Sequence, residues 1–212
     1  MTAPDLRLIV ISDVALAAPR SVLDVVRAAV RAGAPAIQLR DKAASPRALH
    51  DQARRMLEVT RPAGALLFIN DRLDVALATG ADGVHLGPRD LPVAAARSAA
   101  RAAGHPDFLI GASTDDPMAA RAAEAQGASY IGCGAVFGTT SKPGLEEERI
   151  GTARLAEVVA AANVPVVGIG GITPDNVAAV AETGAAGVAV IGAVMKADDV
   201  GSAVRRLLDA FP

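Results

Sequence analysis

Several functional classes depend on residues that this sequence largely lacks. It has no tryptophan, and aromatic residues make up only 2% of its 212 residues, so we expect no aromatic platform on which nucleic-acid bases stack. The net charge of -2 at pH 7 offers no basic surface for nucleic acid or for an anionic membrane. We therefore predict no nucleic-acid partner.

Cysteine and long apolar stretches are scarce as well. The single cysteine, Cys133, excludes an intrachain disulfide, and with only three histidines the sequence offers no Cys/His zinc cluster. No segment stays apolar long enough to span a bilayer. Because Asp5 interrupts the start of the chain and the next apolar run ends at Ser12, no signal peptide is predicted. We expect a cytoplasmic protein with no membrane partner, and a buried Cys133 that acts as a small apolar residue.

A short apolar run followed by a turn and an alanine-rich helical segment recurs eight times along the chain. Capping signals delimit the helices: Ser45-Pro46 places a capping hydroxyl before a proline, and Gly80 follows a helical segment where a left-handed residue is needed. The expected strands span residues 6–12, 36–40, 66–70, 83–86, 108–112, 130–136, 164–169 and 187–191, and the expected helices span residues 21–31, 45–60, 73–78, 91–103, 117–126, 152–162, 174–182 and 199–210.

Eight such βα units predict a (β/α)8 TIM barrel, a fold whose usual length is about 250 residues. An open doubly wound sheet is the competing fold class. The barrel is favoured because the chain holds eight units with nothing left over, and eight strands close. Without linkers or low-complexity tracts, residues 1–212 form a single domain. In such barrels the catalytic groups lie at the carboxyl ends of the strands.

Polar side chains gather where the expected strands end. Each has an ordinary interpretation when taken alone, since Asp commonly caps a helix, Arg40 and Asp41 suit a weak surface pair, and His85 suits a hydrogen-bonded core histidine. Because these side chains would share one rim of the barrel, a binding site is the better interpretation of the whole set. The polar strand ends are residues 38–42, 70–72, 85–90, 113–116 and 138–144.

Glycines after the last two strands predict a phosphate site. Gly170 and Gly171 let backbone amides approach a ligand closely, and the helix expected at Pro174 starts where an anion is favoured. Barrels commonly bind phosphate in the loops after strands seven and eight, and Ile191 and Gly192 lie in the second of these.

A second anion site is predicted on the other side of the barrel mouth. Asp71 and Asp90 follow consecutive strands, which lie roughly 4.8 Å apart in a sheet. Two oxygen ligands suit Mg²⁺, which keeps its waters and also binds substrate phosphates. Arg40, Lys42 and Lys142 would neutralise the rest of a diphosphate.

The order, spacing and strand placement of these residues resemble the thiamine phosphate synthase (thiamine-phosphate pyrophosphorylase) family over nearly the whole chain. The segments that carry the resemblance are Gln38-Leu39-Arg40-Asp41-Lys42, Ile69-Asn70-Asp71, His85-Leu86-Gly87 with Asp90, Gly111-Ala112-Ser113, Thr139-Thr140-Ser141-Lys142, Gly168-Ile169-Gly170-Gly171 and Ile191-Gly192.

This resemblance implies a transferase that joins 4-amino-2-methyl-5-hydroxymethylpyrimidine diphosphate to 4-methyl-5-(2-phosphoethyl)thiazole and releases pyrophosphate and thiamine phosphate. The implied reaction is dissociative: the C–O bond to diphosphate breaks first, the thiazole nitrogen captures the cation, and no general base is required.

The resemblance also implies roles for single residues. Arg40, Lys42, Ser113 and Lys142 would be the catalytic residues. The pyrimidine diphosphate would be held by Gln38, Arg40, Lys42, Asn70, Ser113 and Lys142, the thiazole phosphate by Thr139, Ser141, Gly171, Ile191 and Gly192, and Mg²⁺ by Asp71 and Asp90. Leu39, Asp41 and Thr140 complete the substrate-binding segments.

The chain departs from the family pattern in three places. Pro88 stands where many members have Gln, and Gly192 stands where the family has Ser. Many members have a His one or two positions after Ser113, where this chain has Thr114 and Asp115. We expect these departures to affect substrate affinity more than the class of reaction.

Three alternative functions are open. They are a thiazole tautomerase-like isomerase, a phosphosugar isomerase or epimerase barrel, and a non-catalytic phosphate-ligand-binding barrel. The synthase is favoured because Lys42, Asn70, Asp71 and Asp90 supply the apparatus for a diphosphate, which the tautomerase does not need. Small barrels often pair, so a homodimer is a candidate assembly, although scattered surface Leu and Ala define no patch.

Overall fold

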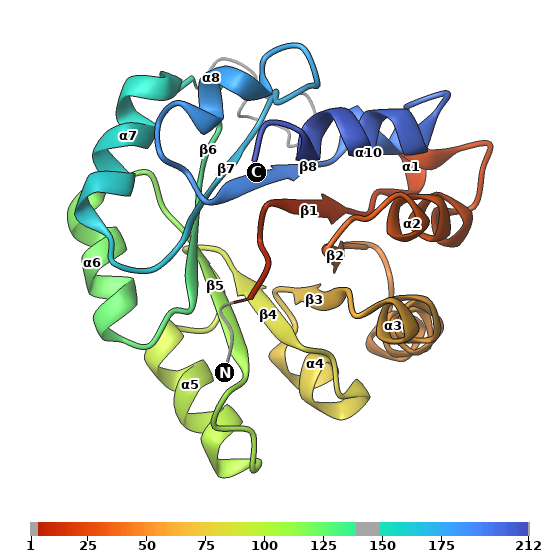
Figure 1. Cartoon of the computed structure of the whole chain (residues 1–212). Helices are drawn as coiled ribbons and strands as arrows, with labels where there is room; N and C mark the ends of the chain where they lie inside the picture. Colours follow the sequence, from red (N-terminus) through yellow and green to blue (C-terminus); the bar gives the residue numbers. More distant parts are fainter. Residues whose placement is uncertain (1–3, 139–148, 212) are drawn as a thin grey trace.

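Eight parallel strands form a closed barrel surrounded by helices (Figure 1), so the fold is the predicted TIM barrel and not an open sheet. The computed structural model describes residues 4–138 and 149–211. The strand order runs once around the barrel from β1 to β8, and β8 pairs with β1. The strands are β1 (Leu8–Ile11), β2 (Ala36–Leu39), β3 (Leu66–Asn70), β4 (Gly83–Leu86), β5 (Leu109–Ser113), β6 (Tyr130–Gly134), β7 (Val166–Ile169) and β8 (Gly187–Val190).

Each predicted helix corresponds to one observed helix, and the described residues contain three further short helical segments. α1 and α9 contain four residues each and η1 contains three, which is too short for a helical period in the sequence. The helical segments are α1 (Val14–Ala17), α2 (Val22–Arg31), α3 (Pro46–Thr60), η1 (Arg61–Ala63), α4 (Leu73–Thr79), α5 (Val93–Ala102), α6 (Pro117–Ala125), α7 (Gly151–Ala161), α8 (Val177–Ala181), α9 (Gly192–Met195) and α10 (Val200–Leu208).

Local capping explains where the helices begin. The Ser45 hydroxyl accepts a hydrogen bond from the Ala48 amide, as the Ser-Pro signal predicts. The predicted helix at residues 174–182 begins only at Val177, so that boundary is wrong. The Asn176 side chain accepts from the Thr173 amide and donates to the Gly171 carbonyl, which holds these residues in a turn.

The strands are buried on both faces. Every residue of β1, β2 and β8 is buried, as expected for parallel strands covered by helices. Gln38 in β2 is a polar exception that is only 3% exposed. It pairs in register with Ile11 and Phe68, which places its side chain at the same level of the barrel as theirs.

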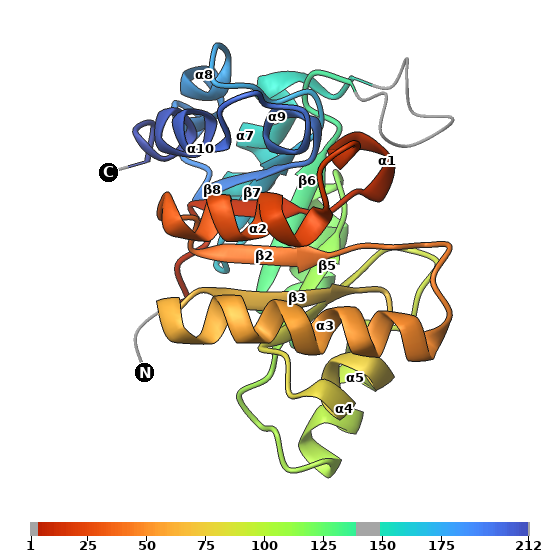
Figure 2. The same cartoon turned by 90° about the vertical axis from the view of Figure 1, so that its right-hand side faces the viewer.

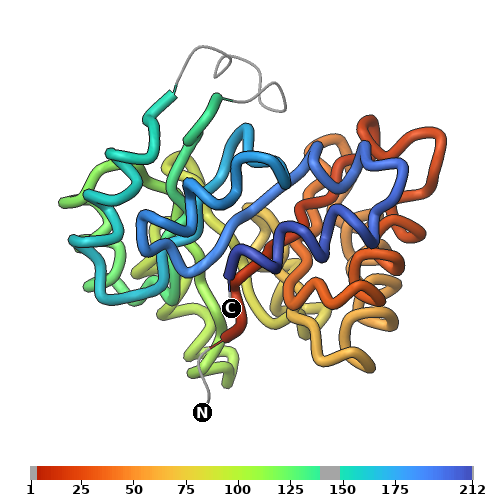
Figure 3. The backbone as a smooth tube through the Cα atoms, turned by 45° about the horizontal axis from the view of Figure 1, so that its top comes forward, coloured from red at the N-terminus to blue at the C-terminus, as the bar shows by residue number. Residues whose placement is uncertain are grey.

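Closure of the barrel brings the two ends of the described chain together. Figure 3 shows the blue C-terminal end of the chain beside the red segment near its start. The Arg7 guanidinium donates to the Phe211 carbonyl oxygen at 3.3 Å. In Figure 2 the arrowheads of β2 and β3 point toward the edge of the barrel at which α1 lies, and this edge is the carboxyl-terminal rim. Within the described residues, no helix is long and apolar enough to cross a membrane.

A glycine inside the barrel makes room for large neighbours. Gly111 in β5 pairs in register with His85 in β4 and Tyr130 in β6. A Cβ atom at this position would lie 2.2 Å from Cζ of Tyr130 and 2.5 Å from Nδ1 of His85. The absence of a side chain therefore lets His85 and Tyr130 meet across β5.

We predict that Gly111→Ala lowers the free energy of unfolding by about 3 kcal/mol or more, because overpacking a rigid interior forces side chains and backbone apart. Urea unfolding followed by circular dichroism measures this. Gly192→Ala is the control, since a Cβ atom there meets only the Lys196 side chain at 4.0 Å. A Gly111→Ala protein as stable as the control would contradict the close packing.

Candidate active site

Side chains from strands all around the barrel line one cavity inside it. Gln38, Arg40, Asn70, His85, Ser113 and Tyr130 supply its polar groups, and Ile9, Ile11, Val167, Ile169, Ala189 and Ile191 are among its apolar groups. Five residues to which the sequence assigns substrate contacts thus meet in this cavity, namely Gln38, Arg40, Asn70, Ser113 and Ile191. Their individual roles stay predictions.

Arg40 is held at the rim by the loop after β1. Its backbone amide donates to the Ser12 hydroxyl at 2.8 Å, and its Nη1 lies 3.5 Å from Oδ2 of Asp13. The side chain is only 13% exposed. Its buried Nε has no hydrogen-bond partner among the described residues. Because the Arg40 side chain also lines the cavity, its guanidinium is suited to an incoming anion.

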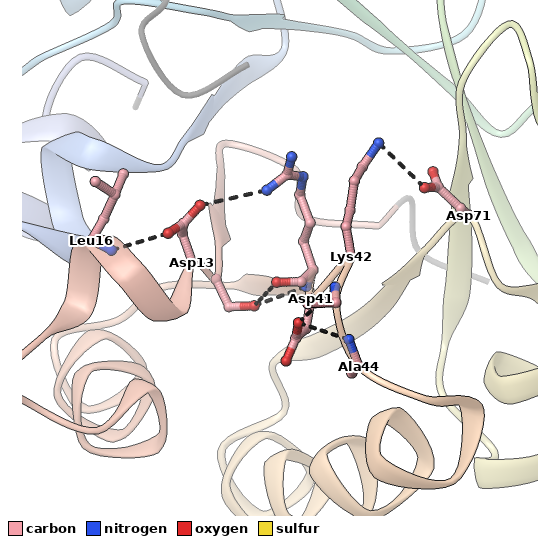
Figure 4. Close-up of polar contacts among 9 residues, drawn as sticks. Asp13, Leu16, Asp41, Lys42, Ala44 and Asp71 are labelled. Carbon is pink, nitrogen blue, oxygen red and sulfur yellow. Dashed lines mark hydrogen bonds and ion pairs between the residues drawn. The ribbon is translucent and has the colours of Figure 1, made fainter. Parts of the chain in front are cut away.

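The contact between Asp13 and Arg40 was not predicted from the sequence. Oδ1 of Asp13 caps α1 by accepting from the Leu16 amide at 3.0 Å, while Oδ2 pairs with Arg40 (Figure 4). The signal was available, because Asp13 follows β1 just as the other polar residues follow their strands. The acidic side chain therefore fixes both α1 and the Arg40 guanidinium.

Two carboxylates meet beside this cavity, as the placement of Asp71 and Asp90 predicts. Asp71 has a left-handed backbone, with φ of 64°, and its amide donates to the His85 carbonyl at 2.8 Å. Oδ2 of Asp90 accepts from the Gly87 amide at 2.7 Å. Lys42 reaches toward Asp71 from the β2 side, with Nζ 3.8 Å from Oδ2 (Figure 4).

The environment of Asp71 disfavours its charged form. Burial, followed by the hydrogen-bonding contact with Asp90 and the charge of that carboxylate, raises the pKa of Asp71 from 3.8 to about 6. Lys42 and Arg40 oppose this shift without cancelling it. The pair thus carries negative charge that nearby cations only partly compensate.

Asp41 and Leu39 lie in the predicted segment but do not line the cavity. The Asp41 carboxylate accepts from the Ala43 and Ala44 amides at 3.2 and 3.1 Å and from the Gln52 side chain at 3.0 Å. It therefore shapes the loop between β2 and α3, and Figure 4 shows it directed away from Asp71. Leu39 is 1% exposed, which gives its side chain a packing role.

His85 joins two other polar groups inside the barrel. Its Nδ1 lies 2.9 Å from the Tyr130 hydroxyl and its Nε2 lies 2.8 Å from the Ser113 hydroxyl. Both ring nitrogens of His85 thus have hydrogen-bond partners, while the ring is half-buried and also lines the cavity. The Tyr130 contact was missed, because it joins residues on β4 and β6 that are far apart in the sequence.

The glycines after β7 have the backbone expected of a close-approach loop. Gly170 and Gly171 have φ of 98° and 67°, and a Cβ atom on Gly171 would lie 2.6 Å from the Gly138 carbonyl oxygen. Gly192 begins α9, and space beside it is open. The predicted contacts at Thr139, Thr140, Ser141 and Lys142 lie outside the described residues.

Cys133 and a possible cluster of metal ligands are the remaining candidates for a functional role. Cys133 is buried, and burial raises the pKa of its thiol to about 12, so it suits the predicted apolar role and not that of a nucleophile. In the described part of the chain, no three His, Cys, Asp or Glu side chains cluster as a metal site. Asp71 and Asp90 would therefore need further ligands from substrate or water to complete a metal shell.

We predict that Asp71→Asn stabilises the metal-free protein at high pH. A pKa of about 6 in the folded state, against 3.8 ordinarily, means that folding favours the protonated form, so wild-type stability falls as pH rises from about 4 to about 6. Asn cannot ionise and tolerates the left-handed backbone.

Urea unfolding should therefore show a gain in free energy for Asp71→Asn at about pH 8 that is absent at about pH 4. Asp198→Asn, at an exposed carboxyl, controls for the loss of a surface charge. The same difference from wild type at both pH values would contradict the raised pKa.

Sequence comparison identifies relatives over most of the chain. The family model described as thiamine monophosphate synthase matches residues 8–194. A thiamine-phosphate synthase of Natronomonas pharaonis is 49% identical over 91% of this chain and 89% of its own length. The thiamine-phosphate synthase of Moorella thermoacetica is 46% identical over 96% of this chain and 95% of its own.

Solved structures agree with the sequence relatives. A thiamine phosphate pyrophosphorylase from Pyrococcus furiosus superposes with a TM-score of 0.87 at 41% identity, covering 98% of this chain and 96% of its own. A 3-hexulose-6-phosphate synthase superposes with a TM-score of 0.73 at 20% identity, which reflects the shared barrel alone. The match of the family model over most of the chain, together with relatives above 40% identity, shows that this protein is a transferase of the thiamine monophosphate synthase family.

Proposed function

We propose that the chain is a thiamine-phosphate synthase that joins the pyrimidine diphosphate to the thiazole phosphate and releases pyrophosphate. The observation that carries this proposal is the Arg40 guanidinium, which is nearly buried at the cavity wall and has a donor without a partner in the described part of the chain. A nearly buried guanidinium favours an anionic ligand in the cavity that Arg40 lines together with Gln38, Asn70 and Ser113.

The polar groups of the cavity suit the two ends of the pyrimidine diphosphate. Gln38 lies deep and is 3% exposed, so its amide is placed to pair with the edge of a heterocyclic ring. Asn70 and Ser113 end their strands and lie nearer the rim with Arg40. The heterocycle would thus enter the barrel while the diphosphate stays at the rim.

The carboxylate pair fits Mg²⁺. Carboxylate oxygens are preferred ligands of this ion. Burial, and after it the neighbouring Asp90, raise the pKa of Asp71, and a divalent cation would stabilise the charged form of this carboxylate. Asp71 and Asp90 would hold the ion, with the diphosphate and water as its other ligands. Bound there, it would supply electrostatic stabilisation to the departing diphosphate.

The remaining work of the protein is to neutralise and orient the substrates. Arg40 and Lys42 would stabilise the negative charge that develops on the diphosphate as the C–O bond breaks, and Lys142 would do so from the loop outside the described residues. The thiazole nitrogen carries no proton, so no side chain needs to remove one. Holding the two substrates in line converts the capture of the cation into a unimolecular step.

The thiazole phosphate would bind near the loops after β7 and β8. The backbone amides of Gly171 and Gly192 would donate to the phosphate, and Ile191 supplies an apolar wall. With Gly192 in place of the family Ser, binding there relies on backbone amides. A cytoplasmic location and a homodimer, both expected from the sequence, stay predictions that accompany this function.

The decisive experiment measures pyrophosphate release from the purified protein with the pyrimidine diphosphate, the thiazole phosphate and Mg²⁺. We expect release only when all three are present, with each omitted in turn as a control. A folded protein that releases no pyrophosphate with the complete mixture would refute the synthase and favour a tautomerase or a binding function.

We predict that Arg40→Ala lowers kcat by roughly 10²–10³-fold, the usual effect of removing one charge-stabilising donor. The fold should persist, because Arg40 bonds to Ser12 through its backbone. Arg54→Ala, on the exposed face of α3, is the matched control and should turn over normally. Lys142→Ala should resemble Arg40→Ala. Near-normal rates for both rim variants would remove these residues from the mechanism.

A further inference from the structure

Three polar side chains on adjacent strands form a hydrogen-bonded chain inside the barrel. The Tyr130 hydroxyl on β6 lies 2.9 Å from Nδ1 of His85 on β4, and Nε2 of His85 lies 2.8 Å from the Ser113 hydroxyl on β5. Gly111 and Gly132 leave the space for this arrangement, since Cβ atoms there would approach the His85 ring to 2.5 and 2.9 Å. The contacts are therefore built into the packing of three strands.

Tyr130 fixes where the proton of the imidazole lies. Its side chain is 1% exposed, and burial raises the pKa of the phenol, so the hydroxyl keeps its proton. A buried O–H group needs an acceptor, and the hydrogen-bond partner of this hydroxyl among the described residues is Nδ1 of His85. Nδ1 must therefore accept, which leaves the ring proton on Nε2.

The position of the His85 proton also sets the direction of the hydrogen bond to Ser113. With its proton on Nε2, His85 donates to the Ser113 oxygen, so the serine proton is available to an acceptor elsewhere. Ser113 lines the cavity beside Gln38, Arg40 and Asn70, where a ligand oxygen would be that acceptor. The opposite direction, with Nδ1 donating, would leave the Tyr130 proton without an acceptor and would direct the Ser113 proton toward His85.

We propose that Tyr130 and His85 are positioning residues that hold the Ser113 hydroxyl as a hydrogen-bond donor toward an anionic oxygen of the bound substrate. Hydrogen-bond donation runs from the Tyr130 hydroxyl to His85 and from His85 to Ser113. The kinetic consequence rests on the proposed function, in which that oxygen belongs to the pyrimidine diphosphate. The proton direction itself is independent of what the substrate is.

The tautomer of His85 tests the proton direction without any assay of activity. In the full-length protein carrying His50→Gln and His105→Gln, His85 is the one histidine left, and both changes lie outside the cavity. Two-bond ¹H–¹⁵N spectra of histidine-labelled protein should show the form protonated at Nε2. Adding Tyr130→Phe should increase the form protonated at Nδ1. An Nδ1–H ring in the protein with Tyr130 intact would overturn the proposal.

A double-mutant cycle tests the effect on turnover. Tyr130→Phe should lower kcat/KM by roughly tenfold when Ser113 is present, but by less than about threefold in a Ser113→Ala background, because both changes remove the same contact. Thr79→Val, which removes a buried hydroxyl on α4 away from the cavity, is the control and should affect stability alone.

Losses that simply multiply would mean that Tyr130 acts independently of Ser113, and would overturn the positioning role. Unchanged turnover in Tyr130→Phe would overturn it as well. A wild-type protein without turnover would instead refute the proposed function, while the His85 tautomer in that same protein would still confirm or refute the proton direction.

Discussion

Pairing between β8 and β1 is the constraint on which the rest of this structure depends. The register Leu8 to Val188 joins the first strand to the last and closes the sheet. A closed barrel has no free edge, and because its strands are parallel, their carboxyl ends all meet at one rim. Gln38, Asn70 and Ser113 come from separate strands and share one cavity for this reason.

Closure also limits the space inside the barrel. Two large aromatic side chains fit because glycine lies next to them on the neighbouring strand, Gly83 beside Phe68 and Gly111 beside Tyr130. The single tyrosine of this aromatic-poor chain lies in this interior, with its ring 5.4 Å from that of Phe68 and 5.5 Å from that of His85. The same side chains therefore fill the barrel interior and supply polar groups to the cavity.

Electrostatics at the rim run against the stability of the free protein. Burial and the nearby Asp90 raise the pKa of Asp71, and the buried Nε of Arg40 lacks a partner within the described residues. Perturbed charges of this kind concentrate at functional sites, where a ligand completes them. A diphosphate with a bound cation would supply both of the missing partners: anionic oxygens for Arg40 and positive charge for the carboxylates.

Apolar periodicity and helix caps such as Ser45 act locally along the chain. The eight βα units, and the positions of Gln38, Asn70 and Asp71 at the strand ends, could therefore be predicted from the sequence. Helices of four residues left no period to detect. The folded structure was needed to show that Asp13 pairs with Arg40, that Asp41 shapes a loop, and that Tyr130 meets His85 across Gly111. These partnerships depend on the register between neighbouring strands, which is set only when the barrel closes.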